Sequence, residues 1–454
     1  MQSLMKISVP KPERRTYTQR MTPALAALLF LSALVAMARL HLVPPPALGA
    51  NAPTTEFSAT RARKHVEAIA REPHLPGTPA HTAVREYIEA QLKAAGFEPQ
   101  IQEAIVPVKQ PSSAVVYVTV RNIVARLKGT EPAEGARSLV LAAHYDSVPT
   151  GPGASDDGAG VAAVLETLRA LQAGPPLKRD VIILITDGEE MGMLGATAFV
   201  AEHPWASEAG LFLNFEMRGT NGPAIMFEVN RENGALMREF ARAVPSPFST
   251  SLAADIYRQM PNDTDVTAFK QVAGAAYLNV AAVGGGFRYH SSLDDVDHLD
   301  LRTLQHMGTY GLGVATHFGN QPLPPARAGD AVWFNAFRWW LVQYPASWAV
   351  PLAIIAVLGL LVLLGVGIRR KAVTFRELGL GLLALPLALV LMFGLIWAFM
   401  TWGMPNWAPM TCSGSPTWPW PGRLCWACMA FSAAGRVLPR FWAQPCSGGA
   451  SSPC

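Results

Sequence analysis

Two histidines that follow apolar stretches of this sequence have the surroundings of metal ligands. His144 comes directly after the apolar run 138–143, and Asp146 lies two residues further on. A histidine at the end of a strand can present a ring nitrogen to a metal ion, and a nearby carboxylate can orient the imidazole. The second histidine, His290, lies in Arg-Tyr-His-Ser-Ser. Either motif alone is weak evidence for a metal site, because a single histidine more often has a structural role.

Three acidic motifs could supply the remaining ligands. Asp156 lies in a glycine-rich stretch before an apolar helix, where it either caps the helix or bridges two cations. Glu189 and Glu190 follow an apolar strand and point in different directions, so one can bind metal while the other handles a proton; the alternative is a solvated acidic turn. Glu216 also ends a strand. Two histidines, three carboxylates and one further glutamate could hold two zinc ions.

Alternating strands and helices must position these motifs. Hydrophobic periodicity predicts helices at 60–70, 81–95, 158–173 and 193–202, and strands at 115–127, 138–143, 180–186 and 211–216. This order predicts an α/β fold, with a mixed, mostly parallel central sheet and helices on both faces. Ligands bind beyond the carboxyl ends of strands in such sheets, and the motifs lie at those ends.

Charged residues are distributed unevenly over the 454 residues. They are common from residue 55 to 330 but absent from 346–368 and 378–402. The uncharged segments 349–368 and 378–402 are long enough to cross a membrane, so transmembrane helices and a lipid bilayer are expected. The net charge of +4 is small and scattered, which gives no support to a nucleic-acid partner.

The N-terminal segment predicts export of the domain that follows it. Residues 1–22 form a basic, cytoplasmic tail, and residues 23–43 are a transmembrane anchor or a signal peptide. Both interpretations place the following domain, residues 55–322, on the non-cytoplasmic side of a multi-pass membrane protein. The abundance of Ala, Arg, Gly and Pro hints at a bacterium, in which this domain would face the periplasm from the inner membrane.

All five cysteines lie in residues 412–454, so the domain before them needs no disulfide, and its metal ligands must be histidines and carboxylates. Residues 405–454 are aperiodic and rich in Trp, Pro, Cys, Gly and Ser. We expect this tail to be disordered or the product of a frameshift. Cys425 and Cys428 have the spacing of a zinc or redox pair, but no second ligand pair accompanies them.

Five ordered motifs give residues 55–322 a resemblance to the co-catalytic di-zinc exopeptidases of the aminopeptidase Y and glutamate carboxypeptidase type. Membrane-bound members similar to the endoplasmic-reticulum metallopeptidase are the nearest subgroup. The matching motifs are His144-x-Asp146, the turn 154–160, Gly188-Glu189-Glu190-x-Gly192, Asn214-Phe215-Glu216 and Tyr289-His290-Ser291.

The resemblance implies two zinc ions per chain and a role for each motif. His144 and Glu216 would bind one zinc and Glu190 and His290 the other, with Asp156 bridging them. The remaining implied roles are a general base (Glu189), an orienting carboxylate for His144 (Asp146) and two residues of the substrate pocket (Asp265 and Tyr289). The implied activity is hydrolysis of a peptide bond near a chain end, most simply as an aminopeptidase acting on peptide substrates.

Other functions compete with this one. A glutaminyl cyclase of the same fold would use one zinc, and the complete ligand set argues against it. Receptor-like relatives that have lost their ligands are a non-catalytic alternative, but no ligand is missing here. A transporter would need polar residues in its spans, and these segments have no charge.

Overall fold

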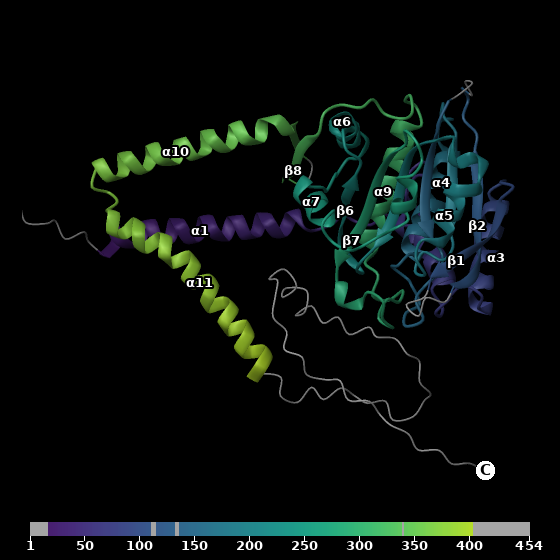
Figure 1. Cartoon of the computed structure of the whole chain (residues 1–454), viewed down its shortest axis with the longest axis horizontal. Helices are drawn as coiled ribbons and strands as arrows, with labels where there is room; N and C mark the ends of the chain where they lie inside the picture. The colour runs from purple at the N-terminus through teal and green to yellow at the C-terminus, as the bar shows by residue number, and fades with distance from the viewer. Residues whose placement is uncertain (1–16, 110–114, 132–135, 338–339, 403–454) are drawn as a thin grey trace, which may run out of the picture. The chain divides into compact units, whose positions relative to one another are not determined.

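A computed structural model of the protein describes residues 17–109, 115–131, 136–337 and 340–402 (Figure 1). The chain divides into two compact units, residues 1–358 and 359–454. The first unit contains an α/β domain built on a mixed sheet, as the sequence predicts, and the sheet has seven strands.

The four central strands of the sheet are parallel, and the outer strands pair antiparallel at both edges. The strands in spatial order are β1 (Gln100–Lys109), β2 (Val115–Leu127), β4 (Val181–Thr186), β3 (Ser138–His144), β5 (Ala209–Met217), β7 (Ala276–Gly284) and β6 (Asn221–Val229). Strands β1, β6 and β7 are additions to those predicted from the sequence. The parallel centre brings four carboxyl ends to one edge of the sheet.

Helices cover both faces of the sheet. One face packs against α2 (Ala59–Ile69), α3 (Pro79–Ala94), α4 (Gly158–Ala173) and α9 (Leu301–Phe318). The other face packs against α5 (Leu194–Glu202) and α8 (Val266–Phe269). The remaining short elements of this region are η1 (Pro204–Ala206), α6 (Gly234–Ala243), α7 (Ser251–Tyr257) and η2 (Gly286–Arg288).

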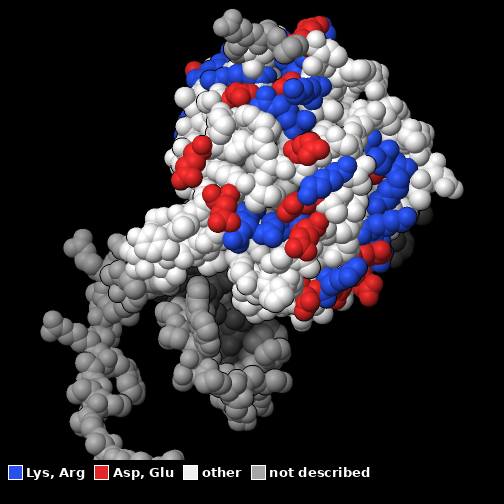
Figure 2. Space-filling model, turned by 90° about the vertical axis from the view of Figure 1, so that its right-hand side faces the viewer, with Lys and Arg blue, Asp and Glu red and all other residues white. Residues whose placement is uncertain are grey.

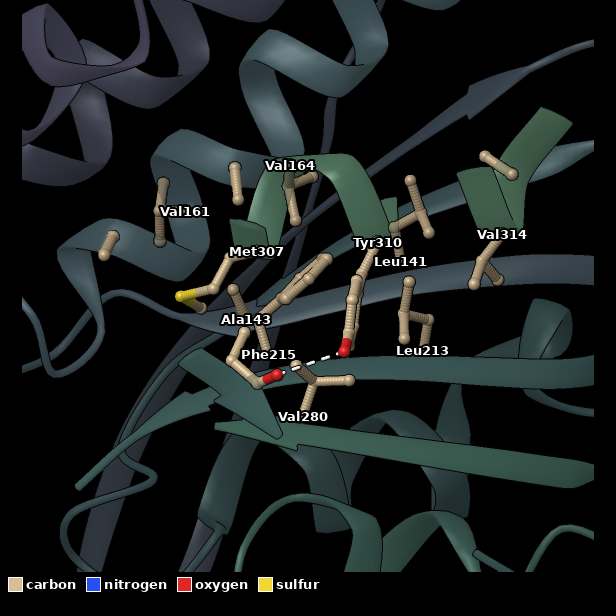
Figure 3. Packing of buried hydrophobic residues seen from close by; sticks show 14 of the residues in the cluster. Leu141, Ala143, Val161, Val164, Leu213, Phe215, Val280, Met307, Tyr310 and Val314 are labelled. Atoms are coloured by element: carbon tan, nitrogen blue, oxygen red, sulfur yellow. Dashed lines mark hydrogen bonds between the residues drawn. The ribbon is translucent and has the colours of Figure 1, made fainter. Parts of the chain in front are cut away.

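Burial on both faces explains why the central strands are continuously apolar. In β3, Leu141 and Ala143 belong to the core beneath α4 and α9, whereas Val140 and Ala142 face the α5 side. Successive side chains of a strand point to opposite faces, so both sets must be apolar. Figure 3 shows Tyr310 of α9 lying over these strands; its hydroxyl donates to the carbonyl of Ala224 at 3.1 Å.

The residues at the start of α4 fix the loop that contains Asp156. Asp157 is the N-cap of this helix, and its carboxylate accepts the Gly160 N–H at 3.0 Å. Gly153, earlier in the loop, has a φ of +67°, and a Cβ there would lie 2.6 Å from the Asp156 carbonyl oxygen. Only glycine fits such a position without strain. The glycine-rich sequence therefore serves both a tight turn and a helix cap.

Charged side chains of both signs cover the side of the domain that bears β1 and α3. Figure 2 shows Lys and Arg interspersed with Asp and Glu on this face. A mixture of this kind produces no extended field of one sign.

A hairpin connects the α/β domain to the apolar helices. Strands β8 (Ala331–Phe337) and β9 (Trp340–Pro345) pair antiparallel, and η3 (Ala346–Trp348) follows. Trp333 is buried against the domain, where its indole N–H donates to Ser249 Oγ at 2.7 Å. Trp340, by contrast, is 57% exposed. The aromatic residues of this segment thus divide between the core and the surface.

Two helices after the hairpin are long and apolar enough to cross a membrane, by length and composition. They are α10 (Ala349–Arg369) and α11 (Phe375–Trp402), with mean hydropathies of 2.9 and 2.4 over their most apolar windows. The N-terminal helix α1 (Tyr17–His41) has a shorter apolar part, Leu25–His41. The anchor or signal peptide at 23–43 and the orientation of the spans remain predictions. The predicted tail at 405–454 and most of the basic segment 1–22 lie outside the described residues.

Candidate metal centre and active site

The carboxyl ends of the four parallel strands, and the loops that follow them, supply all the predicted ligands. His144 is the last residue of β3, and Asp156 lies in the loop that leads from β3 to α4. Glu190 follows β4, Glu216 is the penultimate residue of β5, and His290 lies beyond β7. Residues up to 146 positions apart in the sequence therefore converge because their strands are neighbours.

His144, Asp156 and Glu216 form a first group of potential ligands. The His144 Nε2 atom lies 3.3 Å from Asp156 Oδ1 and 3.9 Å from Glu216 Oε1. All three side chains are buried. These ligand atoms lie within 4.8 Å of one another, close enough to surround one ion.

Asp156, Glu190 and His290 form a second group. The His290 Nε2 atom lies 2.9 Å from Glu190 Oε1 and 3.2 Å from Asp156 Oδ2. Asp156 thus directs one carboxylate oxygen to each group, which is the arrangement of a bridging ligand. His290 has a φ of +54°, a left-handed conformation that is uncommon for residues other than glycine.

The chemistry of these side chains fits zinc. Imidazole nitrogens and carboxylate oxygens are its ordinary ligands in the absence of cysteine. Four buried polar atoms at the centre make no hydrogen bond within the described residues, although His290 Nε2 lies within ion-pair distance of Glu190 and Asp156. A buried polar atom without a hydrogen bond is costly unless something binds it. The four atoms are Asp156 Oδ2, Glu190 Oε1, Glu216 Oε2 and His290 Nε2.

The carboxylates make the centre attractive to a cation. Burial by itself would lower the pKa of His290, but Asp156 and Glu190 beside it raise the pKa to about 9. The pKa of His144 is likewise raised well above its usual value by neighbouring carboxylates, against the effect of burial. Burial and the nearby Asp156 raise the pKa of Glu190 to about 7. Charges that favour a proton on the two imidazoles would equally favour a metal ion in its place.

Asp146 contacts two parts of the centre. The His144 Nδ1 atom lies 3.0 Å from the backbone carbonyl of Asp146 and 3.4 Å from its carboxylate. That carboxylate accepts the backbone N–H groups of Glu189 and Glu190, at 3.0 and 3.2 Å. The predicted orienting residue therefore reaches the imidazole chiefly through its carbonyl, while its carboxylate holds the Glu189–Glu190 turn.

Glu189 lies beside the first group without belonging to it. One of its carboxylate oxygens is within 4.8 Å of ligand atoms of His144 and Glu190. Burial, followed by the charge of Glu216, raises the pKa of Glu189 well above its usual value. Gly188, directly before it, has a φ of +70°, and a Cβ there would lie 3.2 Å from Val120 Cγ1. The turn thus depends on glycine to direct Glu189 into the site.

The two residues predicted for the substrate pocket have different surroundings. Asp265 is buried, shares a hydrogen bond with the Thr186 hydroxyl, and has one carboxylate oxygen without a partner among the described residues. Burial raises the pKa of Asp265 to about 7. Tyr289 is half-buried, and its ring stacks on that of His290 with the centroids 3.6 Å apart.

Two residues of the site were not assigned a role from the sequence. Asp294 is buried, and its carboxylate accepts the backbone N–H groups of Ser155 and Asp156. Arg218 donates from Nη1 to the Tyr289 hydroxyl at 2.8 Å. The sequence signal for Asp294 was its position four residues after His290. The hydrogen-bond partners of Asp294 and Arg218 lie in other loops, so the sequence does not indicate them.

Part of the chain is similar to a known family of peptidases. Residues 122–315 match the model of peptidase family M28. The resemblance predicted from the motifs is confirmed by this match, which covers less than half of the chain.

Two curated relatives are membrane or organelle peptidases by name. The chain is 28% identical over 363 residues to endoplasmic reticulum metallopeptidase 1 of Mus musculus, a match that covers 74% of this chain and 40% of the relative. It is 29% identical over 358 residues to the vacuolar membrane protease of Candida dubliniensis, covering 77% of this chain and 38% of the relative. The chain therefore spans less than half the length of these relatives.

Solved structures with a similar fold include two types of enzyme. A Zn-dependent exopeptidase from Parabacteroides distasonis is 21% identical, with a TM-score of 0.46 over 58% of this chain and 99% of that one. The glutaminyl cyclase of Porphyromonas gingivalis is 23% identical, with a TM-score of 0.45 over 56% of this chain and 96% of that one. The family match and the metallopeptidase relative support a hydrolase of the peptidase class.

Proposed function

We propose that the protein is a membrane-anchored exopeptidase that depends on two zinc ions and acts as an aminopeptidase. The main observation behind the proposal is that Asp156 belongs to both groups of potential ligands. One of its oxygens faces His144 and the other faces His290. The first and second groups of ligands, referred to below as the two triads, therefore share a single carboxylate. A centre for a single ion would not need this second triad.

The residues of the site suit hydrolysis of an amide. When bound, the zinc ions would supply Lewis acidity that lowers the pKa of a water molecule and polarises the scissile carbonyl. Glu189 would accept the proton of the attacking water and deliver it to the leaving amine. Asp146 would hold Glu189 in place through the backbone N–H that its carboxylate accepts.

Charge in the site favours a substrate with a free amino terminus. Asp265 is a carboxylate outside the two triads, and its Oδ1 atom, which has no partner among the described residues, could accept a hydrogen bond from a substrate ammonium group. Arg218, a cation that could attract a substrate carboxylate, already donates to the Tyr289 hydroxyl and the Asp263 carbonyl. These charges support aminopeptidase activity rather than carboxypeptidase activity.

The flanking segments support a membrane location. Helices α10 and α11 have the length and composition of spans, and one of the relatives is a membrane protease by name. We propose a multi-pass protein whose peptidase domain faces the non-cytoplasmic side, because basic residues precede the N-terminal apolar segment and follow α10 at residues 369–371. In a bacterium this side would be the periplasm.

The test combines metal analysis with a panel of substrates. The full-length chain, purified in detergent, should contain about two zinc ions and hydrolyse aminoacyl-β-naphthylamides, and chelation should abolish hydrolysis until zinc is restored. The N-acetylated substrates should resist hydrolysis, because they lack the ammonium group. Equal hydrolysis of acetylated substrates would contradict the aminopeptidase assignment. Cyclisation of glutaminyl-β-naphthylamide without hydrolysis of other substrates would instead indicate a glutaminyl cyclase.

A further inference from the structure

A second cavity, with a volume of about 420 Å³, lies between α6 and the β8–β9 hairpin. Its lining, as far as the structure describes it, contains no residue of the candidate metal centre. The lining residues come from α6, from the segment that leads into β8, and from the end of β9 with η3. Sites for small molecules have volumes of about 300–1,000 Å³, so this cavity is large enough for a small ligand.

Backbone hydrogen bonds fix the walls of this cavity. The Ala346 N–H donates to the Asp330 carbonyl at 2.8 Å, which ties η3 to the segment that leads into β8. The Ala328 N–H donates to the Glu232 carbonyl at 3.2 Å, which ties the same segment to the loop before α6. The three parts of the lining are therefore joined to one another, and the hollow between them has a defined shape.

The lining offers one cation, one anion and one buried acceptor to a ligand. Arg238 is exposed, and within the part of the chain that the structure describes it makes no hydrogen bond or ion pair. Asp330 Oδ1 accepts the Glu232 N–H at 2.6 Å, so its other oxygen can still face a ligand. Gln343 Oε1 is buried and accepts no hydrogen bond from the described residues. An amide oxygen left unpaired is costly, so it favours a ligand that brings an N–H or O–H group.

The cavity lies where the first candidate span begins. Ala346 and Ser347 line it, and the apolar segment that could cross a membrane runs from Ala346 to Arg369, a length of 24 residues. At about 1.5 Å per residue this segment is about 36 Å long, whereas the hydrocarbon core of a bilayer is about 30 Å thick. The first residues of the span would therefore lie among the lipid headgroups. Trp340 and Trp348 nearby in the chain are exposed, and tryptophan is enriched at that level of a membrane.

We propose that this cavity binds the headgroup of an ethanolamine phospholipid. The proposal rests on the membrane location proposed above and does not depend on peptidase activity. Arg238 would pair with the phosphate, which a guanidinium binds through both charge and directed hydrogen bonds. The ammonium group would donate to Gln343 Oε1 beside the negative charge of Asp330. The trimethylammonium group of a choline lipid has no N–H to donate, so the unpaired oxygen favours ethanolamine over choline.

Lipid titration of the zinc-loaded, full-length protein tests this preference. Phosphatidylethanolamine and phosphatidylcholine with the same acyl chains would be added to delipidated protein in detergent, and native mass spectrometry would measure the fraction of protein that carries each lipid. The ethanolamine lipid should bind about 10-fold or more tightly, which is the contribution of a hydrogen bond to a charged group. Equal affinity for the two lipids would overturn the proposal. Soluble glycerophosphoethanolamine should bind more weakly than the lipid, and equally tight binding would assign the cavity to a soluble ligand instead.

Two substitutions should affect the two ends of the headgroup differently. Gln343→Leu removes the acceptor and should abolish the preference for ethanolamine while affinity for the choline lipid stays unchanged. Arg238→Gln removes the cation and should weaken binding of both lipids by about 10-fold, with their ratio preserved, because both contain the phosphate. Arg242→Gln is the matched control, since this arginine lies one turn further along α6, pairs with Glu239 at 2.6 Å and does not line the cavity. Melting temperatures without added lipid would show that each variant folds, and a Gln343→Leu protein that folds and keeps the preference would refute the proposal.

Flotation with lipid vesicles separates this proposal from the membrane location on which it rests. A wild type that fails to float would contradict the membrane location and the headgroup site together. A wild type that floats but binds both lipids equally would contradict the headgroup site alone. A wild type that floats and prefers the ethanolamine lipid, but hydrolyses no peptide, would leave this site in place and contradict only the peptidase function.

Discussion

The carboxylate of Asp294 holds the backbone of Asp156, the residue that faces both triads. Asp294 Oδ2 accepts the Asp156 N–H at 3.1 Å, and its Oδ1 accepts the Ser155 N–H at 2.8 Å. Asp294 lies four residues after His290, so this contact joins the loop of one predicted zinc ligand to the loop of another. The two loops bury Asp294, and this burial raises its pKa to about 6.

Asp294→Ala should loosen the bridging loop and weaken zinc binding by about 10–100-fold, as removal of outer-shell support does. Asp294→Asn keeps one acceptor oxygen and should have a smaller effect. Zinc affinity would be measured by competition with a chelator of known affinity. Asp297→Asn, which changes a side chain that is 91% exposed, is the control and should bind zinc like the wild type. Wild-type affinity in the Asp294→Ala variant would refute this role.

Glu189→Gln should lower kcat by about 10²–10⁴-fold, because the amide keeps the shape of the side chain but cannot accept the proton. Zinc content should stay at the wild-type level, since Glu189 is not among the predicted ligands. Steady-state kinetics and elemental analysis of the same preparation would measure both quantities. Glu202→Gln, on the exposed end of α5, provides the control. If Glu189→Gln retained wild-type turnover, another residue would have to be the base.

Substitution of the ligands should change the number of bound zinc ions in a defined way. Asp156→Ala removes the residue shared by both triads and should cost both ions, whereas His290→Ala should cost mainly one. Asp146→Asn should leave both sites present but weaken affinity or activity by about 10–100-fold. Elemental analysis after dialysis against a fixed low zinc concentration would measure occupancy. An equal loss of zinc in all three variants is incompatible with the assignment.

His65 should make the domain less stable in mild acid. Burial lowers its pKa in the folded protein, and its Nδ1 atom lies 2.8 Å from the Tyr87 hydroxyl. Below a pH of about 6.5 the unfolded chain binds a proton that the folded protein resists, so stability is complete above this pH and is lost as pH falls through it. Melting temperatures from pH 8 to 5 should fall less steeply in His65→Gln than in the wild type. Parallel curves would rule out a contribution from His65.

A tag inserted between residues 131 and 136 reports the side of the membrane on which the domain lies. The basic residues at the N-terminus and at 369–371 should stay in the cytoplasm, so the tag should be exposed on the opposite side. Protease added to cells with a permeable outer envelope should cleave there. A cytoplasmic reporter protein should remain intact in the same sample. If the tag were protected together with the reporter, the domain would lie on the cytoplasmic side and the predicted orientation would be wrong.

The central elements of the fold were predictable because their apolar patterns are strong. The predicted strand at 115–127 coincides with β2, and the helix predicted at 158–173 coincides with α4. Strand β1 was not predicted. It lies at the edge of the sheet and contains Pro107, and its apolar residues do not mark its inward side, since Gln102 is partly buried whereas Ile105 is exposed. Edge strands form through pairing with a neighbour rather than through their own pattern.

The sequence by itself determined which residue types stand at the carboxyl ends of the strands, and hence the candidate ligands and the candidate base. A motif such as His-Tyr-Asp or Gly-Glu-Glu is local, and its chemistry can be inferred from a few residues. Only the tertiary structure decided that Asp294 holds Asp156, that Arg218 holds Tyr289, and that the Asp146 carboxylate holds the Glu189–Glu190 turn. These contacts join residues 43 to 138 positions apart, and strand order and loop packing, which leave no local signature, bring them together.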